Sequence, residues 1–204
     1  MAIEDIINIL KKEVRKFDAT TIDLINLETD SHDKVLISAI LSSRTKDKVT
    51  LEASKKLFSN ISCIKELKKL SVREIEKLIY PVGFYKTKAK HLKELSKIVS
   101  IPKDFDGLVK LPGVGRKVAN LYLSVALGRD EICVDTHVHR ISNRLGWVKA
   151  KTPFETEKGL KNVLPKKYWK IINSLLVSYG QRVCTPRNPK CRDCMIQKLC
   201  KKVL

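Results

Sequence analysis

The sequence has few of the residues that mark turns, linkers and extended structure. Its 204 residues include only 8 glycines and 7 prolines, and aromatic side chains make up 6% of the total. With 43% hydrophobic and 31% charged residues, this composition excludes fibrous and intrinsically disordered proteins. A chain of this length buries a sizeable core, as one domain of ordinary size or as two small ones.

Long apolar stretches are also missing. No run approaches the roughly 18 apolar residues that span a bilayer, and the start at residues 1–7 lacks the basic segment of a secretory signal. We therefore expect a cytoplasmic protein with no membrane partner. In that reducing compartment, the 6 cysteines are expected to be thiols, metal ligands or catalysts rather than disulfides.

Acidic residues are scarce relative to basic ones. The chain has 41 Lys and Arg against 22 Asp and Glu, a formal net charge of +19. Scattered surface charge for solubility is one explanation, but an excess this large favours a nucleic-acid partner. An anionic membrane surface is less suitable, because no helix combines a basic face with an apolar face rich in aromatic residues.

Hydrophobic side chains recur at helical spacing along nearly the whole chain. The first apolar stripe comprises Ile3, Ile6, Ile7, Leu10, Val14 and Phe17. The apolar stretch 35–41 predicts a buried helix over about 33–42, and capping boxes at 71–74 and 152–155 mark two helix starts. Further helices are expected over about 46–58, 86–99, 105–110, 115–127, 136–145 and 167–182. The chain is predicted to be all-α.

One turn has the composition of an anion-binding site. Leu111-Pro112-Gly113-Val114-Gly115 contains two glycines, which can adopt positive φ and let another backbone come close. It leads into a helix that begins near Gly115, so free backbone N–H groups and the positive end of the helix dipole point out of it. A plain tight turn is the alternative, and the net charge favours binding of a DNA phosphate.

Lys117 is the first candidate for chemistry. It is expected in the first turn of that helix, beside Arg116 and at the positive end of the helix dipole. These surroundings make its amine a candidate nucleophile. The alternative is that it is one of the many lysines that only face solvent.

Asp135 is the second candidate, at the position of a helix N-cap. Capping alone explains an Asp there, but a carboxylate fixed at that point can also stabilise positive charge developing on a sugar. His137 and His139 lie two residues apart, on different faces of a helix, so we expect packing or phosphate contacts rather than a metal pair. The strand-like segment 131–138 has no partner strand, and we interpret it as the segment that leads into this helix.

Four cysteines form the strongest chemical pattern, Cys184-x6-Cys191-x2-Cys194-x5-Cys200. The basic residues among and around them are Arg182, Arg187, Lys190, Arg192, Lys198 and Lys201. Four thiolates at short spacing bind either a tetrahedral Zn(II) or an iron–sulfur cluster, and nearby basic side chains offset their charge. The spacing does not separate these two metals. The remaining cysteines, Cys63 and Cys133, are expected to be small buried hydrophobes.

Three segments together resemble the endonuclease III family of helix-hairpin-helix DNA glycosylases: residues 111–120, residues 134–140 and the four-cysteine tail. Their order and spacing match, and the resemblance extends to residues 36–47 and 82–89. It implies a two-lobed, all-α helix-hairpin-helix glycosylase fold, with a six-helix domain and a helical iron–sulfur cluster domain.

The resemblance also implies where the domains lie. The six-helix domain would cover residues 22–132, with the helix-hairpin-helix at about 105–127. The second domain would combine residues 1–21 with residues 133–204 and hold the cluster loop at 184–200.

The implied cofactor is a [4Fe–4S] cluster with a chiefly structural role. Its ligands would be Cys184, Cys191, Cys194 and Cys200. The cluster would shape a basic loop that contacts the DNA backbone through Arg187 and Lys190. The hairpin contacts would come from Leu111, Gly113, Val114, Gly115 and Arg116.

The implied activity is that of a bifunctional DNA glycosylase and AP lyase of base excision repair. An oxidised pyrimidine is flipped out of the duplex and Lys117 attacks the sugar C1′, while Asp135 stabilises the positive charge. The resulting Schiff base allows β-elimination, which cleaves the strand 3′ to the abasic site. The partner would be double-stranded DNA with a damaged base or abasic site, bound by a monomer that is nucleoid-associated in a prokaryote.

Two alternatives remain at this stage. One is a monofunctional glycosylase that acts on a mismatched T or A, although such relatives usually lack lysine at position 117. The other is an iron–sulfur module that binds DNA without catalysis.

Two residues depart from the family pattern. Arg44 stands where bacterial members carry glutamine, and its larger charged side chain would enter the space left by the flipped base or bind a phosphate. Phe84 occupies what resembles the leucine wedge position, where its ring would stack on the orphaned base.

Overall fold

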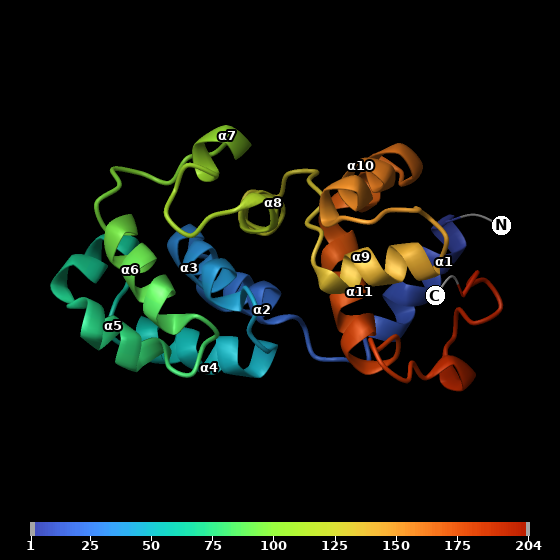
Figure 1. Ribbon diagram of the computed structural model, residues 1–204, viewed down its shortest axis with the longest axis horizontal. Helices are drawn as coiled ribbons and strands as arrows, with labels where there is room; N and C mark the ends of the chain where they lie inside the picture. Colours follow the sequence, from blue (N-terminus) through green and yellow to red (C-terminus); the bar gives the residue numbers. More distant parts are fainter. Residues whose placement is uncertain (1–2, 203–204) are drawn as a thin grey trace. The chain divides into compact units, whose positions relative to one another are not determined.

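The computed structural model describes residues 3–202. Within this range every regular element is a helix, which confirms the all-α prediction (Figure 1). None of the described helices is long and apolar enough to cross a membrane. The chain forms two compact units, Thr21–Arg129 and Met1–Thr20 with Asp130–Leu204. The sequence analysis put the domain boundaries after residues 21 and 132.

The Thr21–Arg129 unit is built around one buried helix, α3 (His32–Ser42). Around it the chain forms α2 (Thr21–Thr29), α4 (Asp47–Phe58), the 3₁₀ helix η1 (Ile64–Lys69), α5 (Val72–Ile79), α6 (Tyr85–Leu95), α7 (Phe105–Leu108) and α8 (Arg116–Val125). Residues 35–41 of α3 are each at most 1% exposed, because α2, α4, α6 and α8 all pack against this helix. The predicted buried helix is confirmed.

Two helix starts have the predicted capping boxes. At α5 the Ser71 hydroxyl accepts from the Glu74 N–H at 3.2 Å, and a Glu74 carboxylate oxygen accepts from the Ser71 N–H at 2.7 Å. The same exchange between Thr152 and Glu155 begins α10 (Pro153–Val163). Each box satisfies two N–H groups that a helix start leaves without partners, which is why both helices begin where the sequence predicts.

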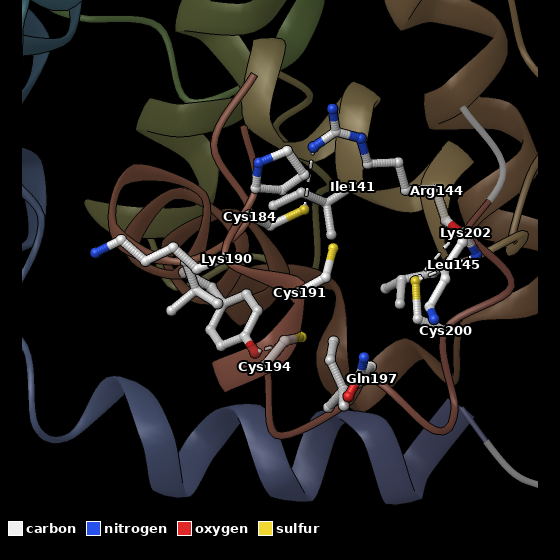
Figure 2. Close-up of a pocket in the computed structure, with 14 residues that line it drawn as sticks. Ile141, Arg144, Leu145, Cys184, Lys190, Cys191, Cys194, Gln197, Cys200 and Lys202 are labelled. Carbon is white, nitrogen blue, oxygen red and sulfur yellow. Dashed lines mark hydrogen bonds between the residues drawn. The ribbon is translucent and has the colours of Figure 1, made fainter. Parts of the chain in front are cut away.

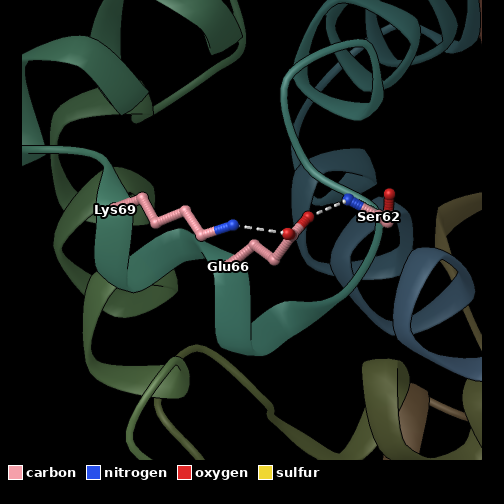
Figure 3. A network of polar contacts seen from close by, with 3 residues as sticks. All are labelled: Ser62, Glu66 and Lys69. Carbon is pink, nitrogen blue, oxygen red and sulfur yellow. Dashed lines mark hydrogen bonds and ion pairs between the residues drawn. The ribbon is translucent and has the colours of Figure 1, made fainter.

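The 3₁₀ helix η1 was not predicted from the sequence, and it depends on two buried side chains and a small polar network. Ile64 and Leu67 are 2% and 0% exposed and anchor it in the core. Glu66 accepts from the Lys69 ammonium and from the Ser62 N–H, each at 2.7 Å (Figure 3). Lys69 first, and then the Ser62 N–H, lower the pKa of Glu66. Since this network is solvent-exposed, the buried apolar pair contributes most of the stabilisation.

The second unit packs α11 (Trp169–Arg182) against α9 (Thr136–Arg144) and α1 (Ile3–Val14). It also contains α10, the 3₁₀ helix η2 (Lys166–Tyr168) and the 3₁₀ helix η3 (Cys191–Asp193). Its core joins Ile7 and Leu10 of α1 to Leu176 of α11, and Ile196 of the cysteine tail is buried in the same cluster. The tail is therefore anchored in the core of the unit by an apolar side chain.

Several sequence-based expectations need correction. Cys133 is 0% exposed as expected, but Cys63 is only half-buried because it is the residue that caps the start of η1. Phe17 lies beyond the end of α1. The helix expected over 105–110 is a single turn, because the chain bends at Val109 into the hairpin.

Candidate active site, DNA-binding hairpin and cysteine pocket

The turn between α7 and α8 has the compact backbone expected of it. The Val114 N–H donates to the Leu111 carbonyl at 3.1 Å, and Gly113 has φ +77°. A Cβ on Gly113 would lie 2.9 Å from Nδ1 of His91. Conformation and close packing therefore both require glycine here. The Val114 side chain is 5% exposed and fills the hairpin interior.

The hairpin ends at an open helix N-terminus. Gly115 is the N-cap of α8, and no side chain forms a cap hydrogen bond there. A Cβ built on Gly115 would meet no atom within 4 Å, so the space beside this N-cap residue is open. An exposed helix start with no capping side chain is suited to an anion such as a phosphate. The adjacent Arg116 is exposed, and its guanidinium lies 4.6 Å from the centre of the Phe105 ring of α7.

Lys117 lies at the second position of α8 and is half-buried. Its ammonium donates to Oγ of Ser42 at 3.2 Å, and this hydroxyl donates in turn to the Ala39 carbonyl at 2.8 Å. The start of α8 therefore lies beside the end of α3. Ser42 was not singled out from the sequence, because no local pattern indicates a contact between residues 75 positions apart.

Arg44 and Phe84 lie together on the surface of the same unit. Both have positive φ, +52° and +58°, and the guanidinium of Arg44 lies 5.3 Å from the Phe84 ring centre. The two loops are joined by a hydrogen bond of 3.1 Å from the Gly83 N–H to Oγ1 of Thr45. A Cβ on Gly83 would collide with the Arg44 carbonyl oxygen. The residues expected to contact the unpaired base form one stacked pair.

Asp135 belongs to the other unit and is the N-cap of α9, as predicted. Its Oδ1 accepts from the N–H groups of His137 and Val138, both at 2.9 Å. Neither of these bonds uses Oδ2. The segment before it is held by a bond of 3.1 Å from the buried Asn173 amide to the Cys133 carbonyl. The carboxylate is thus fixed by two backbone donors on its own helix.

The two histidines after Asp135 are used inside their unit. Nδ1 of His139 lies 2.6 Å from Oγ1 of Thr156, and Nδ1 of His137 lies 3.1 Å from the Arg140 guanidinium. These contacts fit the packing role that was one of the two expectations for this pair.

The four cysteines of the tail line one pocket of about 130 Å³ (Figure 2). Its other lining residues are Ile141, Arg144, Leu145, Tyr179, Val183, Pro189, Lys190, Ile196, Gln197 and Lys202. Three sulfurs have polar neighbours: Cys194 has the Tyr179 hydroxyl at 3.0 Å, Cys184 the Arg144 guanidinium at 3.4 Å and Cys200 the Lys202 N–H at 3.4 Å. Burial raises the pKa of the Cys200 thiol. The pocket is apolar apart from the sulfurs and their donors.

Two arginines of α9 hold the backbone of the loop that begins the cysteine tail. Arg140 donates to the Cys184 carbonyl at 2.9 Å, and Arg144 donates to the carbonyls of Thr185 and Pro186 at 2.7 and 3.0 Å. The sequence analysis missed this role. Their spacing of four residues, which places both on one face of a helix, was the available signal.

The basic loop that follows carries the two residues expected to contact the DNA backbone. Arg187 and Lys190 are both exposed. The Thr185 hydroxyl donates to the Arg187 carbonyl at 2.7 Å, and the Lys190 N–H donates to the Val183 carbonyl at 3.0 Å. The loop backbone is therefore ordered from within while these two cations face solvent.

A glycine hairpin feeding an open helix start, in an all-helical chain with a strong positive charge, defines a helix-hairpin-helix DNA-binding protein. Residues 37–166 match the family described as HhH-GPD superfamily base excision DNA repair protein. The chain is 46% identical over 179 residues to Endonuclease III of Thermotoga maritima, which covers 85% of this chain and 84% of that protein. The chain spans less of some other relatives, for example 47% of Endonuclease III homolog 2 of Arabidopsis thaliana, to which it is 45% identical over 181 residues.

Two solved structures share the fold. A trapped Endonuclease III–DNA covalent intermediate, an estranged-adenine complex, has a TM-score of 0.80 at 30% identity, over 99% of this chain and 97% of that one. A thermostable thymine-DNA glycosylase has a TM-score of 0.74 at 25% identity, over 95% and 96%. The chain belongs to the endonuclease III family of the HhH-GPD superfamily, and it is a DNA glycosylase of base excision repair.

The two hairpin glycines should respond differently to alanine. In Gly113→Ala an alanine must adopt a positive φ, and its Cβ must lie against His91. The free energy of unfolding should therefore fall by about 1–3 kcal/mol. Gly115→Ala should cost less than about 1 kcal/mol, the difference between a glycine and an alanine N-cap.

DNA affinity should fall more in Gly115→Ala than in Gly113→Ala, the reverse of the order expected for stability. The Gly115→Ala methyl enters the open space in front of α8 and should weaken duplex binding about fivefold, or about 1 kcal/mol. Thermal unfolding and fluorescence anisotropy on both variants check this. Unchanged affinity in Gly115→Ala would show that this helix start does not contact DNA.

Proposed function

We propose that this protein is a bifunctional DNA glycosylase and AP lyase that removes oxidised pyrimidines through a Schiff base on Lys117. The observation that carries the proposal is the place of Lys117, in the first turn of a helix whose open start is suited to a phosphate. A backbone phosphate bound at Gly115 would bring the adjacent sugar near the amine of Lys117, two residues further along the chain. Lys117 then attacks C1′ as the base leaves.

The Schiff base accounts for the second activity. An imine at C1′ makes the 2′ proton acidic, so β-elimination breaks the bond to the 3′ phosphate. Support for a covalent route comes from the solved relative described as a trapped Endonuclease III–DNA covalent intermediate. The substrate is double-stranded DNA with a damaged base or an abasic site, bound by a monomer.

Asp135 stabilises the positive charge that develops on the sugar as the base departs. Two backbone N–H groups hold Oδ1 of its carboxylate and fix its orientation. A carboxylate that is held before the substrate binds needs no reorganisation during the reaction, which is the condition under which charge stabilisation is most effective.

A monofunctional mismatch glycosylase is the second candidate, and the similarity to a solved thymine-DNA glycosylase favours it. In such an enzyme water attacks the sugar and no covalent link to the protein forms. The amine of Lys117 in the hairpin helix argues for the bifunctional route, because a monofunctional enzyme has no use for a nucleophile there.

A [4Fe–4S] cluster on Cys184, Cys191, Cys194 and Cys200 is the second part of the proposal. A structural zinc ion needs its four sulfurs at about 2.3 Å from one point, and within residues 3–202 no three Cys, His, Asp or Glu side chains are arranged to hold one ion. An iron–sulfur cluster spreads its thiolate ligands around a larger body. Thiols that line a pocket without meeting at its centre therefore suit a cluster better than zinc (Figure 2).

The pocket also has room and donors for such a group. A volume of about 130 Å³ is roughly ten times the least that one water molecule needs. Arg144, Tyr179 and the Lys202 N–H supply hydrogen bonds to sulfur, which offset the charge of thiolates. The cluster would be structural, holding the loop of Arg187 and Lys190 in place for the DNA backbone.

The Schiff base is tested by borohydride reduction. Protein mixed with borohydride and duplex DNA containing thymine glycol should form a covalent complex and a cleaved strand. The complex forms because borohydride reduces an imine between protein and DNA to a stable amine. Lys117→Ala should form neither while still binding the duplex. If the wild type removes the base but cannot be trapped on thymine glycol or on an abasic site, the monofunctional route is correct.

Asp135 can be tested separately from its capping role. Asp135→Asn keeps the N-cap, because asparagine caps as well as aspartate, so thermal stability should change little. Base release should slow roughly 100-fold or more through loss of the charge. Asp135→Ala should lose about 1 kcal/mol of stability in addition. A normal rate of base release in Asp135→Asn would show that Asp135 only caps α9 and has no part in the chemistry.

The cofactor is tested by elemental analysis of protein purified without oxygen. We expect about four irons and four inorganic sulfides per chain, with little zinc, and visible absorption from sulfur-to-iron charge transfer. Cys194→Ser should lose most of the iron and loosen the basic loop. One zinc per chain and no sulfide would overturn the assignment.

A further inference from the structure

A second lysine, Lys88, lies beside Lys117 in the Thr21–Arg129 unit, which is called the hairpin unit below because it contains the hairpin. Lys88 of α6 is 6% exposed, an unusual degree of burial for a lysine. Its ammonium donates to the Leu41 carbonyl at 2.9 Å, to the Ser43 carbonyl at 2.6 Å and to Oγ1 of Thr45 at 3.3 Å. All three acceptors lie at the end of α3 or in the turn that follows it.

These contacts use the full capacity of the side chain. An ammonium has three donors and no acceptor, and Lys88 has three acceptors around it. The end of a helix leaves its last carbonyls without partners. The Leu41 carbonyl near the end of α3 is buried, so it needs a donor from the protein. Lys88 supplies that donor from 47 residues away.

The turn held by Lys88 carries two residues that contact candidate site residues, Ser42 and Arg44. Between Leu41 and Ser43 lies Ser42, whose hydroxyl accepts from the Lys117 ammonium. Between Ser43 and Thr45 lies Arg44, which stacks on Phe84. Arg44 has φ +52°, a backbone conformation that L-residues adopt only when the surroundings fix it.

We infer that Lys88 is a positioning residue of this glycosylase, which fixes the turn after α3 so that Ser42 orients the Lys117 amine and Arg44 stacks on Phe84. The inference rests on the proposed function of Lys117.

The charge of Lys88 comes at an electrostatic cost. Burial, and then repulsion from Lys117, lower the pKa of Lys88 to about 8. An apolar residue would avoid that cost but would leave the buried Leu41 carbonyl and the partly buried Ser43 carbonyl without this donor. The contacts of Lys88 thus explain both its burial and its position beside a second cation.

The same helix provides a matched control. Lys93 of α6 also donates to three carbonyls, those of Leu67, Lys68 and Leu70, at 3.3, 2.9 and 2.6 Å. These carbonyls belong to η1 and the residue after it, and neither Ser42 nor Arg44 lies among them. Lys88→Met and Lys93→Met therefore remove the same kind of interaction from the same helix, next to the candidate site in one case only.

The test compares single-turnover cleavage at an abasic site, under saturating protein, with the Kd for the same duplex. Lys88→Met should slow the chemical step about 100-fold, the scale of a misplaced reacting group, with Kd within about threefold. Lys93→Met should keep the rate within about twofold, even where thermal unfolding shows an equal loss of stability. Equal rates in the two variants, or a Lys88→Met effect on Kd alone, would overturn the inference.

A second variant covers the case in which Lys88→Met does not fold. Thr45→Val keeps the side-chain shape but removes the hydroxyl that contacts both Lys88 and the Gly83 N–H. It should slow the chemical step about tenfold, and an unchanged rate would count against the inference.

The proposed function fails in a different way from the inference. If the wild type neither cleaves nor can be trapped by borohydride, the bifunctional route is wrong. The rate of base release then replaces cleavage in the same comparison of Lys88→Met with Lys93→Met.

Discussion

The proposed chemistry of the hairpin unit depends on the hydrogen bonds that the carbonyls at the end of the buried helix α3 receive from Lys88. Helix α3 has no exposed side over residues 35–41, and the Leu41 carbonyl near its end is buried. Lys88 supplies the donor that water supplies at an exposed helix end. The Ser42 hydroxyl at that end accepts from Lys117 and donates to the Ala39 carbonyl. The helix that fills the core thereby also orients the proposed nucleophile.

The second unit uses the same kind of interaction around its cysteines. Arg140 and Arg144 project from α9 and donate to three successive carbonyls, those of Cys184, Thr185 and Pro186. The excess of cations that first indicated a nucleic-acid partner therefore has two roles. Some cations, such as Arg187 and Lys190, face solvent, where they can meet phosphates. Others, such as Arg140 and Arg144, donate to backbone carbonyls and hold the loop that carries Arg187 and Lys190.

Local sequence patterns predicted local structure well. The capping boxes, the buried stretch 35–41 and the N-cap at Asp135 all depend on residues within a few positions of one another, and the structure has them as predicted. The contacts of Lys88 and Arg144 join residues 40 to 47 positions apart. Apart from the four-residue spacing of Arg140 and Arg144, nothing in the local sequence distinguishes Lys88 or Arg144 from the many cations that face solvent, so their partners required the fold.

The hairpin also combines a feature that the local sequence predicts with one that depends on the fold. Its glycines predicted the turn, and the turn formed as expected. Val114 was grouped with the residues expected to contact DNA; its side chain is 5% exposed, and its N–H donates to the Leu111 carbonyl within the turn. A pattern of residue types indicates that a turn binds an anion, but which atoms point outward depends on the packing beneath it.

Arg44 illustrates how a change of residue type alters a site through its neighbours. Considered alone, an arginine in place of a glutamine adds charge and length. In the structure its guanidinium lies over the Phe84 ring, and the two loops are joined through Thr45 and Gly83. The arginine is thereby held by an aromatic partner that is itself proposed to stack on the orphaned base. Replacing either residue removes a contact of the other, so variants at Arg44 and Phe84 are best compared as a pair.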